Sequence, residues 1–295
     1  MNPVIGIVGV SNHKYDHNYY ISSAYVGWLR THGCRIIAIN PIWNHTTLEK
    51  VIKYTDGILF QGAENHPYPD DPVFRTISHI LEIVVSEKYG KIPVYGICNG
   101  LQSIATYFSN IPWDTLKTFV ANIHSTSKTH YTPHRPNVFK SLLDNTNTVI
   151  PLNYNHKYVV STNTFNNSKR LTDNFNVLAS SFSKSKKYKH IEFVSCMRHR
   201  NLPIFASMFH PEKANNEWSP SQSFINRSIP TVMTSENICA FFVELCRLYR
   251  IERNHPQSGW NNKILDKYDV SGLELTYVKP CMFDDPMVRV YLRKM

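Results

Sequence analysis

The segment Val94-Tyr-Gly96-Ile-Cys98-Asn-Gly100-Leu101 decides how this chain folds. Its apolar start is typical of a buried strand, and the residues after Gly100 have the apolar spacing of a helix. A Gly-x-Cys-x-Gly turn between a strand and a helix presents a nucleophile, because such a tight turn requires small residues two positions away on either side. The helix N-terminus would stabilise a Cys98 thiolate, and backbone N–H groups of the turn would hold an oxyanion. Cys98 is therefore the candidate nucleophile.

Strands and helices alternate around this turn in the first part of the chain. Continuous short apolar runs are typical of strands that are buried on both faces. The pattern predicts strands at 4–10, 35–39, 57–60 and 92–97, and helices at 18–32, 47–53, 70–89 and 100–108. Gly33 and Gly90 follow two of these helices, as glycine commonly does, and Asp70 or Asp71 would cap the third helix. We therefore expect an α/β fold with a mostly parallel central sheet and helices on both faces.

The alternation stops near Asn110. Residues 120–150 are rich in Thr, Ser, His, Asn and Pro, which is typical of exposed connections around short strands. The later segments that we expect to be regular are strands at 189–198, 203–209 and 273–278 and an amphipathic helix at 233–250. No internal repeat or linker divides the sequence, so we expect a single domain over residues 1–295.

A thiol nucleophile needs a general base, and His210 is the best placed of the 14 histidines for that role. It follows the strand expected at 203–209, and parallel sheets display their active-site residues at such strand ends. Glu212, two residues later, would orient the imidazole and stabilise its cationic form. We expect most other histidines to be surface residues and the other cysteines to be packing residues.

Composition excludes several classes of protein. Of the 295 residues, 42% are hydrophobic and 18% are charged, so the chain can bury a core. The longest apolar runs are far shorter than the ~20 residues of a membrane span, and the N-terminus lacks the features of a signal peptide. We therefore expect a cytoplasmic protein without a membrane segment. Six cysteines without a CxxC pair indicate neither a zinc site nor a disulfide framework.

The chain is basic, with 32 Lys and Arg against 22 Asp and Glu and a net charge of +10. A surface of that charge can attract a nucleic acid, an anionic lipid or an acidic substrate. The densest basic cluster, at 184–189, lies in a Ser-rich connection and is typical of a solvated loop. Because the sequence contains no motif of a nucleic-acid-binding domain, we expect no nucleic-acid partner.

Together, these segments resemble a known group of enzymes. The turn at Cys98 and the His-Pro-Glu string at His210 resemble the class I glutamine amidotransferase-like superfamily, and within it the chain is similar to the gamma-glutamyl hydrolase family. The segments that carry the narrower similarity are 19–29, 57–62, 151–157, 210–213 with Glu217-Trp218, and the tail ending in Cys281-Met-Phe. Asn155-His-Lys157 and His210-Pro-Glu-Lys213 are more specific than the turn alone.

The resemblance implies a flavodoxin-like core and a gamma-glutamyl peptidase that uses no metal and no cofactor. Cys98 would attack the gamma-glutamyl amide carbonyl and form an acyl-enzyme that water releases. His210 would take the thiol proton and pass it to the leaving amine, and Glu212 would orient His210. The backbone N–H groups of Asn99 and of the Gly62 loop would hold the oxyanion.

The resemblance also implies how substrate is held. His156 matches a family histidine at the substrate pocket and would lie beside the scissile bond. The expected partner is a small-molecule substrate, a poly-gamma-glutamylated folate or a related gamma-glutamyl compound. The sequence leaves the oligomeric state open, with a homodimer as one option. Family members usually carry a secretory leader, so a lysosomal, vacuolar or secreted location follows if a leader is missing here.

Two positions depart from the family pattern. The loop after the third strand reads Gln61-Gly62-Ala63 where the family usually has Pro-Gly-Gly, which reduces the backbone freedom at Ala63. Asn99 stands where an apolar residue is common, and the string around Cys98 is also similar to gamma-glutamyl-GABA hydrolases. Three functions therefore stay open: hydrolysis of folylpoly-gamma-glutamates, hydrolysis of a smaller gamma-glutamyl amide, or binding by a catalytically weak homologue.

Overall fold

The structure is a computed structural model, and it describes residues 2–11, 19–64, 66–131, 151–183, 191–218, 222–253 and 289–292. Within these residues, the main sheet has nine strands in the order β4-β1-β5-β6-β11-β10-β9-β7-β8. The first five are β4 (Arg35–Ile39), β1 (Val4–Val8), β5 (Gly57–Phe60), β6 (Val94–Ile97) and β11 (Ile204–Ser207), and all pair in parallel. Their carboxyl ends meet at one edge of the sheet, where α/β proteins place their sites.

The other half of the sheet is antiparallel. It consists of β10 (Glu192–His199), β9 (Phe175–Phe182), β7 (Thr118–Tyr131) and β8 (Pro151–Val159). The expectation of exposed connections around short strands over 120–150 was wrong for its first part, because β7 is one strand of 14 residues. This strand bonds to β8 and to β9, so its polar sequence does not prevent pairing. The remainder, 132–150, lies outside the described residues.

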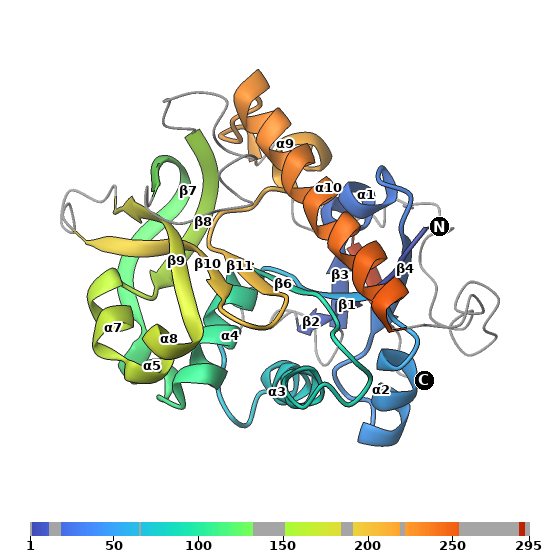
Figure 1. The fold of residues 1–295 in the computed structure, drawn as a ribbon. Coiled ribbons are helices and arrows are strands. Elements are labelled where there is room, and N and C mark those ends of the chain that lie inside the picture. The colour runs from blue at the N-terminus through green and yellow to red at the C-terminus, as the bar shows by residue number, and fades with distance from the viewer. Residues whose placement is uncertain are drawn as a thin grey trace.

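Helices cover both faces of the parallel half (Figure 1). One face carries α1 (Ser23–Arg30), α9 (Lys213–Asn216) and α10 (Ile229–Glu252), and the other carries α2 (His45–Ile52), α3 (Pro72–Val85) and α4 (Asn99–Ser109). The short helices α5 (Trp113–Leu116), α7 (Thr162–Asn167) and α8 (Lys169–Asn174) accompany the antiparallel strands. The predicted α/β fold class is confirmed.

Several helix boundaries differ from those predicted from the sequence. At one of them, strand pairing replaces the first turn of the expected helix. The helix expected from residue 18 begins only at Ser23, because β3 (Tyr19–Ser22) pairs with β2 (Val10–Ser11) and β12 (Arg289–Leu292) in a separate three-stranded sheet. The helix expected over 70–89 starts at the predicted Asp71 cap but ends at Val85. The last helix extends four residues before and two beyond the predicted 233–250. The strand expected at 273–278 lies outside the described residues.

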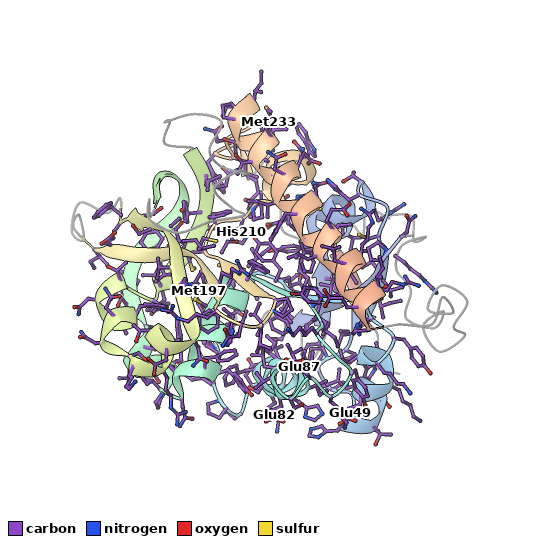
Figure 2. All side chains as sticks on the ribbon, viewed as in Figure 1. Glu49, Glu82, Glu87, Met197, His210 and Met233 are labelled. Atoms are coloured by element: carbon purple, nitrogen blue, oxygen red, sulfur yellow. The ribbon has the colours of Figure 1, made fainter. Side chains whose placement is uncertain are left out.

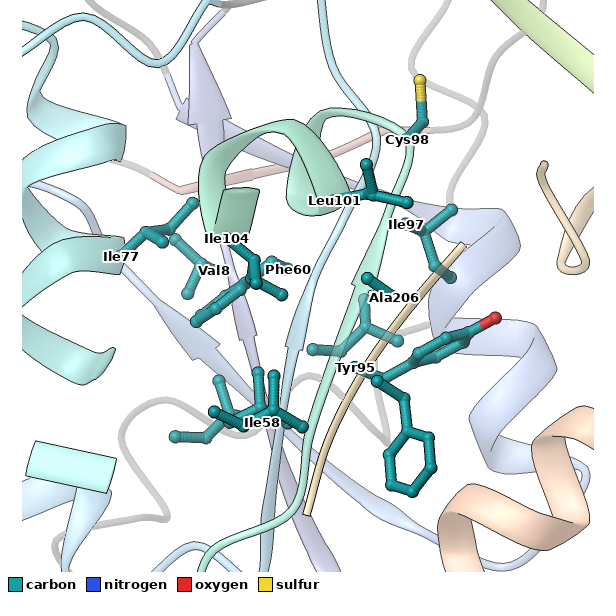
Figure 3. Close-up of a cluster of buried hydrophobic side chains, with 14 of the residues drawn as sticks. Val8, Ile58, Phe60, Ile77, Tyr95, Ile97, Cys98, Leu101, Ile104 and Ala206 are labelled. Atoms are coloured by element: carbon teal, nitrogen blue, oxygen red, sulfur yellow. The ribbon is translucent and has the colours of Figure 1, made fainter. Parts of the chain in front are cut away.

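The core lies between the sheet and these helices. Tyr95 of β6 packs against Trp28 of α1 and Phe242 of α10, with ring centroids 6.2 and 5.7 Å apart. On the opposite face, Figure 3 shows Ile104 of α4 next to Phe60 of β5. Because both faces of β6 are buried, the strand is held firmly and so is the turn that follows it. No helix among the described residues is long and apolar enough to cross a membrane.

Candidate active site

The turn after β6 has the strained geometry that the sequence predicts. Cys98 has φ +53° and ψ −100°, a conformation that non-glycine residues rarely adopt. Its amide N–H donates to the carbonyl of Ser207 at 2.7 Å, which ties the turn to β11. Figure 3 shows the sulfur of Cys98 pointing away from the hydrophobic cluster at the start of α4. The sheet thus holds the thiol at its carboxyl edge, next to the positive end of a helix.

Glycines at 96 and 100 allow this turn to form. A Cβ atom on Gly100 would lie 2.4 Å from the carbonyl oxygen of Phe60, and one on Gly96 would lie 2.6 Å from Ile104 Cδ1 and 2.8 Å from the Gly100 backbone. The overlap at Gly100 involves backbone, which cannot move aside as a flexible side chain can. The spacing of the two glycines around Cys98 is therefore a steric requirement.

His210 and Glu212 form a buried pair just beyond β11. Glu212 Oε1 lies 2.8 Å from His210 Nδ1, and the residues are only 1% and 7% exposed. Burial lowers the pKa of His210, but the charges of Glu212 and Cys98 raise it by a larger amount. The resulting pKa is about 9, above the ordinary value of 6.5. The Nε2 atom of His210 is buried without a conventional hydrogen bond among the described residues. Nδ1 is thus engaged by the carboxylate, and Nε2 is left to exchange a proton.

The structure brings His156 to the same place. It belongs to β8, whose Asn155 carbonyl oxygen lies 3.9 Å from the thiol of Cys98 and whose Asn153 carbonyl accepts the N–H of His210 at 2.8 Å. Burial and then the charge of His210 lower the pKa of His156 to about 3. Neither of its ring nitrogens has a hydrogen-bond partner among the described residues. His156 is therefore buried in its neutral form.

The two expected oxyanion donors lie on separate segments. Asn99 is the first residue of α4, so its N–H lies at the helix N-terminus beside Cys98. The N–H of Gly62 donates to the phenolic oxygen of Tyr25 at 2.9 Å. For Gly62 to serve as an oxyanion donor, that bond must be exchanged for one to the substrate. Its predicted role stays a prediction.

Tyr25 is a site residue that the sequence did not single out. Its ring is buried in α1, and its hydroxyl also lies 3.4 Å from His210 Nδ1. Burial and the charge of Glu212 raise the pKa of Tyr25 well above its usual range, so the phenol keeps its proton. The one available signal was its position in the family-like segment 19–29, which does not reveal the contact.

The other described cysteines are structural. They are Cys34, Cys196, Cys239 and Cys246, and all are buried and free of disulfides. Burial raises the pKa of each of these thiols, to about 12 for Cys34, so they stay protonated. A buried, protonated thiol is a poor nucleophile. Among the described residues, no three His, Cys, Asp or Glu side chains are grouped so that they could hold a metal ion.

Figure 2 places His210 near the middle of the molecule, well away from the exposed residue Met233 at the outer part of α10. The site is thus formed inside the molecule, where the carboxyl ends of β6 and β11 meet β8. Three residues predicted from separate parts of the sequence, Cys98, His210 and His156, come together there with Glu212.

Comparison with curated proteins gives relatives with one recurring name. The chain is 28% identical over 263 residues to gamma-glutamyl hydrolase B of Dictyostelium discoideum. The aligned region covers 83% of this chain and 72% of the relative. It is 27% identical over 258 residues to human gamma-glutamyl hydrolase, with coverage of 83% and 78%. It is 24% identical to probable gamma-glutamyl hydrolase 3 of Arabidopsis thaliana, with an alignment that covers 87% of this chain and 75% of the relative. The predicted resemblance is confirmed.

Solved structures agree on the fold. The glutaminase domain of Trypanosoma brucei CTPS with bound acivicin matches with a TM-score of 0.58 at 14% identity, over 84% of this chain and 94% of that domain. A putative GMP synthase subunit from Thermoplasma acidophilum matches with a TM-score of 0.53 at 17% identity, over 86% of this chain and 100% of that protein. A family model described as glutamine amidotransferase class-I matches residues 18–226, well over half of the sequence. This chain therefore belongs to the glutamine amidotransferase class-I family.

Proposed function

We propose that the protein is a cysteine-dependent hydrolase of gamma-glutamyl amide bonds, acting on folylpoly-gamma-glutamates through an acyl-enzyme on Cys98. The observation that carries the proposal is the juxtaposition of Cys98, on a strained turn at a helix N-terminus, with the buried pair of His210 and Glu212. The names of the curated relatives support gamma-glutamyl amides as the substrate class. The net charge of +10 favours encounter with a polyanionic tail.

The reaction begins when the thiol proton of Cys98 passes to His210. The His210 pKa of about 9 favours the imidazolium that this transfer forms. The Cys98 thiolate attacks the amide carbonyl carbon, and the carbonyl oxygen becomes an oxyanion held by the Asn99 N–H and by Gly62 once its bond to Tyr25 is exchanged. Nε2–H of His210 then protonates the nitrogen of the leaving amine, and the C–N bond breaks.

Release of the acyl group uses the same residues, with His210 now acting as a base instead of an acid. After the amine departs, His210 is neutral and Nε2 accepts a proton from water, which attacks the thioester carbonyl. Collapse of the second tetrahedral intermediate breaks the C–S bond, and the thiolate and imidazolium are restored. Glu212 keeps the ring oriented through Nδ1 in both halves of the reaction.

His156 is proposed to hold the substrate next to the scissile bond. A gamma-linked glutamate carries an α-carboxylate close to the carbonyl that is attacked. A neutral imidazole supplies one N–H donor without placing a second positive charge beside His210, and the pKa of about 3 keeps His156 in that form. Neither nitrogen has a hydrogen-bond partner within the part of the chain that the structure describes, which supports this role.

Incubation with pteroylpentaglutamate, with products read by mass spectrometry, tests the proposal. We expect shortened folates together with released glutamate or gamma-linked peptides, in wild type and not in Cys98→Ala. Turnover of a small gamma-glutamyl amide with the pentaglutamate left intact would favour the second enzyme function. Binding of the pentaglutamate without any hydrolysis or Cys98 adduct would identify a binding protein and overturn the proposal.

A further inference from the structure

The side chain of Gln61 ties together three segments that converge behind the active site. It is 2% exposed. Its Nε2 donates to the carbonyls of Val8 at 2.9 Å and Tyr20 at 3.0 Å, and its Oε1 accepts the N–H of Ser22 at 3.0 Å. Val8 ends β1, Tyr20 lies in β3 and Ser22 precedes α1. Three of the four hydrogen bonds that an amide side chain can make are therefore formed within the protein.

The next residue of the loop, Gly62, is hydrogen-bonded to α1. The N–H of Gly62 donates to Tyr25, which lies three residues after Ser22. Residues 61 and 62 are thus fastened side by side to the junction of β3 and α1. Since both bonds join residues 37 to 39 apart in sequence, they fix the loop relative to a separate part of the fold.

Gly62 occupies the space between the nucleophile and the base. A Cβ atom at this position would lie 2.7 Å from His210 Cε1, 2.9 Å from Tyr25 Oη and 3.3 Å from Cys98 Cβ. A side chain at this position would therefore collide with the imidazole and crowd Cys98, so Gly62 directly faces both reacting residues. A shift of Gly62 toward them presses on the imidazole and a shift away opens space beside Cys98, because close-packed interiors transmit such shifts.

We propose that Gln61 is a positioning residue for the reaction, whose side-chain amide holds Gly62 in place between Cys98 and His210. The inference rests on the proposed hydrolytic function. Gln61 acts through Gly62, since the three hydrogen bonds of its side chain all go to backbone groups of β1, β3 and the start of α1. Tyr25 supports the same loop through the Gly62 N–H. A residue with this role governs the rate of the chemical step more than the binding of substrate.

Gln61→Met tests the proposal, because methionine has a similar length and cannot replace the three hydrogen bonds. We expect kcat to fall by about 10- to 100-fold, as a misplacement on the order of 1 Å does elsewhere, with KM changed only a few-fold. Stoichiometric alkylation of Cys98 by iodoacetamide counts the competent sites, so that kcat is given per folded site. The matched control is Thr55→Val, which removes a buried hydroxyl bonded to Ile52 just before β5, at the far end of that strand from Gln61.

The outcomes separate positioning from simple stability. We expect both variants to lower Tm and only Gln61→Met to lower kcat. If Gln61→Met lowers Tm but keeps kcat per site within twofold of wild type, the inference is wrong and the proposed function stands. If Gln61→Met does not fold, Ser22→Pro decides, because it removes the N–H that Gln61 Oε1 accepts, at a φ of −69° that proline adopts. A fall in kcat of about tenfold supports positioning by Gln61, and an unchanged kcat overturns it. A wild-type protein inactive on every gamma-glutamyl substrate overturns the proposed function and this inference with it.

Discussion

Replacing Glu212 by Gln removes the charge that keeps His210 protonated. Glu212 Oε1 lies 2.8 Å from Nδ1 and the residue is 1% exposed, so water does not screen the pair. The pKa of His210 is about 9 against an ordinary 6.5, although burial acts in the opposite direction. At about 1.36 kcal/mol for each pKa unit, the neighbouring charges favour the imidazolium by a net ~3 kcal/mol.

Without the carboxylate, burial opposes only the charge of Cys98, so we expect the pKa of His210 to fall in Glu212→Gln. In the proposed mechanism the imidazolium protonates the leaving amine, so its loss on raising the pH would define the alkaline limb of kcat/KM. This limb should lie near pH 9 in wild type and at least about one pH unit lower in the variant, which then has roughly fivefold less activity than wild type at the wild-type midpoint. His210→Asn should cost more, about 10²- to 10⁴-fold in kcat, because it removes the proton carrier itself.

The assay is the pH profile of kcat/KM from about pH 5 to about pH 10 for wild type and both variants. Glu82→Gln is the matched control, since Glu82 also approaches a histidine, His79 Nδ1 at 3.3 Å, but at an exposed position well separated from His210 in Figure 2. An alkaline limb that stays in place in Glu212→Gln would refute the electrostatic reasoning. A Glu212→Gln enzyme weaker than His210→Asn would reverse the assigned roles.

Two further predictions concern histidines that are buried in the neutral form. His156→Ala should lower kcat/KM for gamma-glutamyl substrates by roughly ten- to a hundred-fold, the effect of losing one donor worth ~1.5–3 kcal/mol to a charged group; wild-type kinetics would show that His156 does not touch the substrate. Burial lowers the pKa of His199 to about 4, so its contribution to stability is full above pH 6.5 and is lost as the pH falls toward 4. His199→Phe should therefore flatten part of the decline in the free energy of urea unfolding over that range, and an unchanged slope would contradict this assignment.

The sequence predicted the part of the site that depends on local geometry. The turn at Cys98 could be predicted because the overlaps that forbid a side chain at Gly96 and Gly100 arise within a single strand-turn-helix unit and its neighbour β5. His210 could be predicted because residues that follow a parallel strand emerge at the same edge as Cys98. Glu212 could be predicted together with His210, because a carboxylate two residues later can reach the imidazole.

Contacts between distant segments could not be predicted in the same way. Tyr25 and Gln61 make their contacts because the start of α1 packs onto the loop after β5, and neither residue has a sequence pattern that indicates this packing. The apolar spacing of a helix continues back through Tyr19, so nothing local showed that 19–22 pairs as β3 instead. The register of β7 with β8 and β9 likewise depends on tertiary pairing of polar strands.

The most direct test of the central claim is the mass of the protein during turnover. After rapid acid quenching with a gamma-glutamyl substrate, intact-protein mass spectrometry should detect one acyl group per chain, and peptide mapping should locate it on Cys98. Cys98→Ala should show no adduct and no hydrolysis while remaining folded, because a small residue fits the turn. An adduct on another residue, or a Cys98→Ala protein within a few-fold of wild-type activity, would contradict the account.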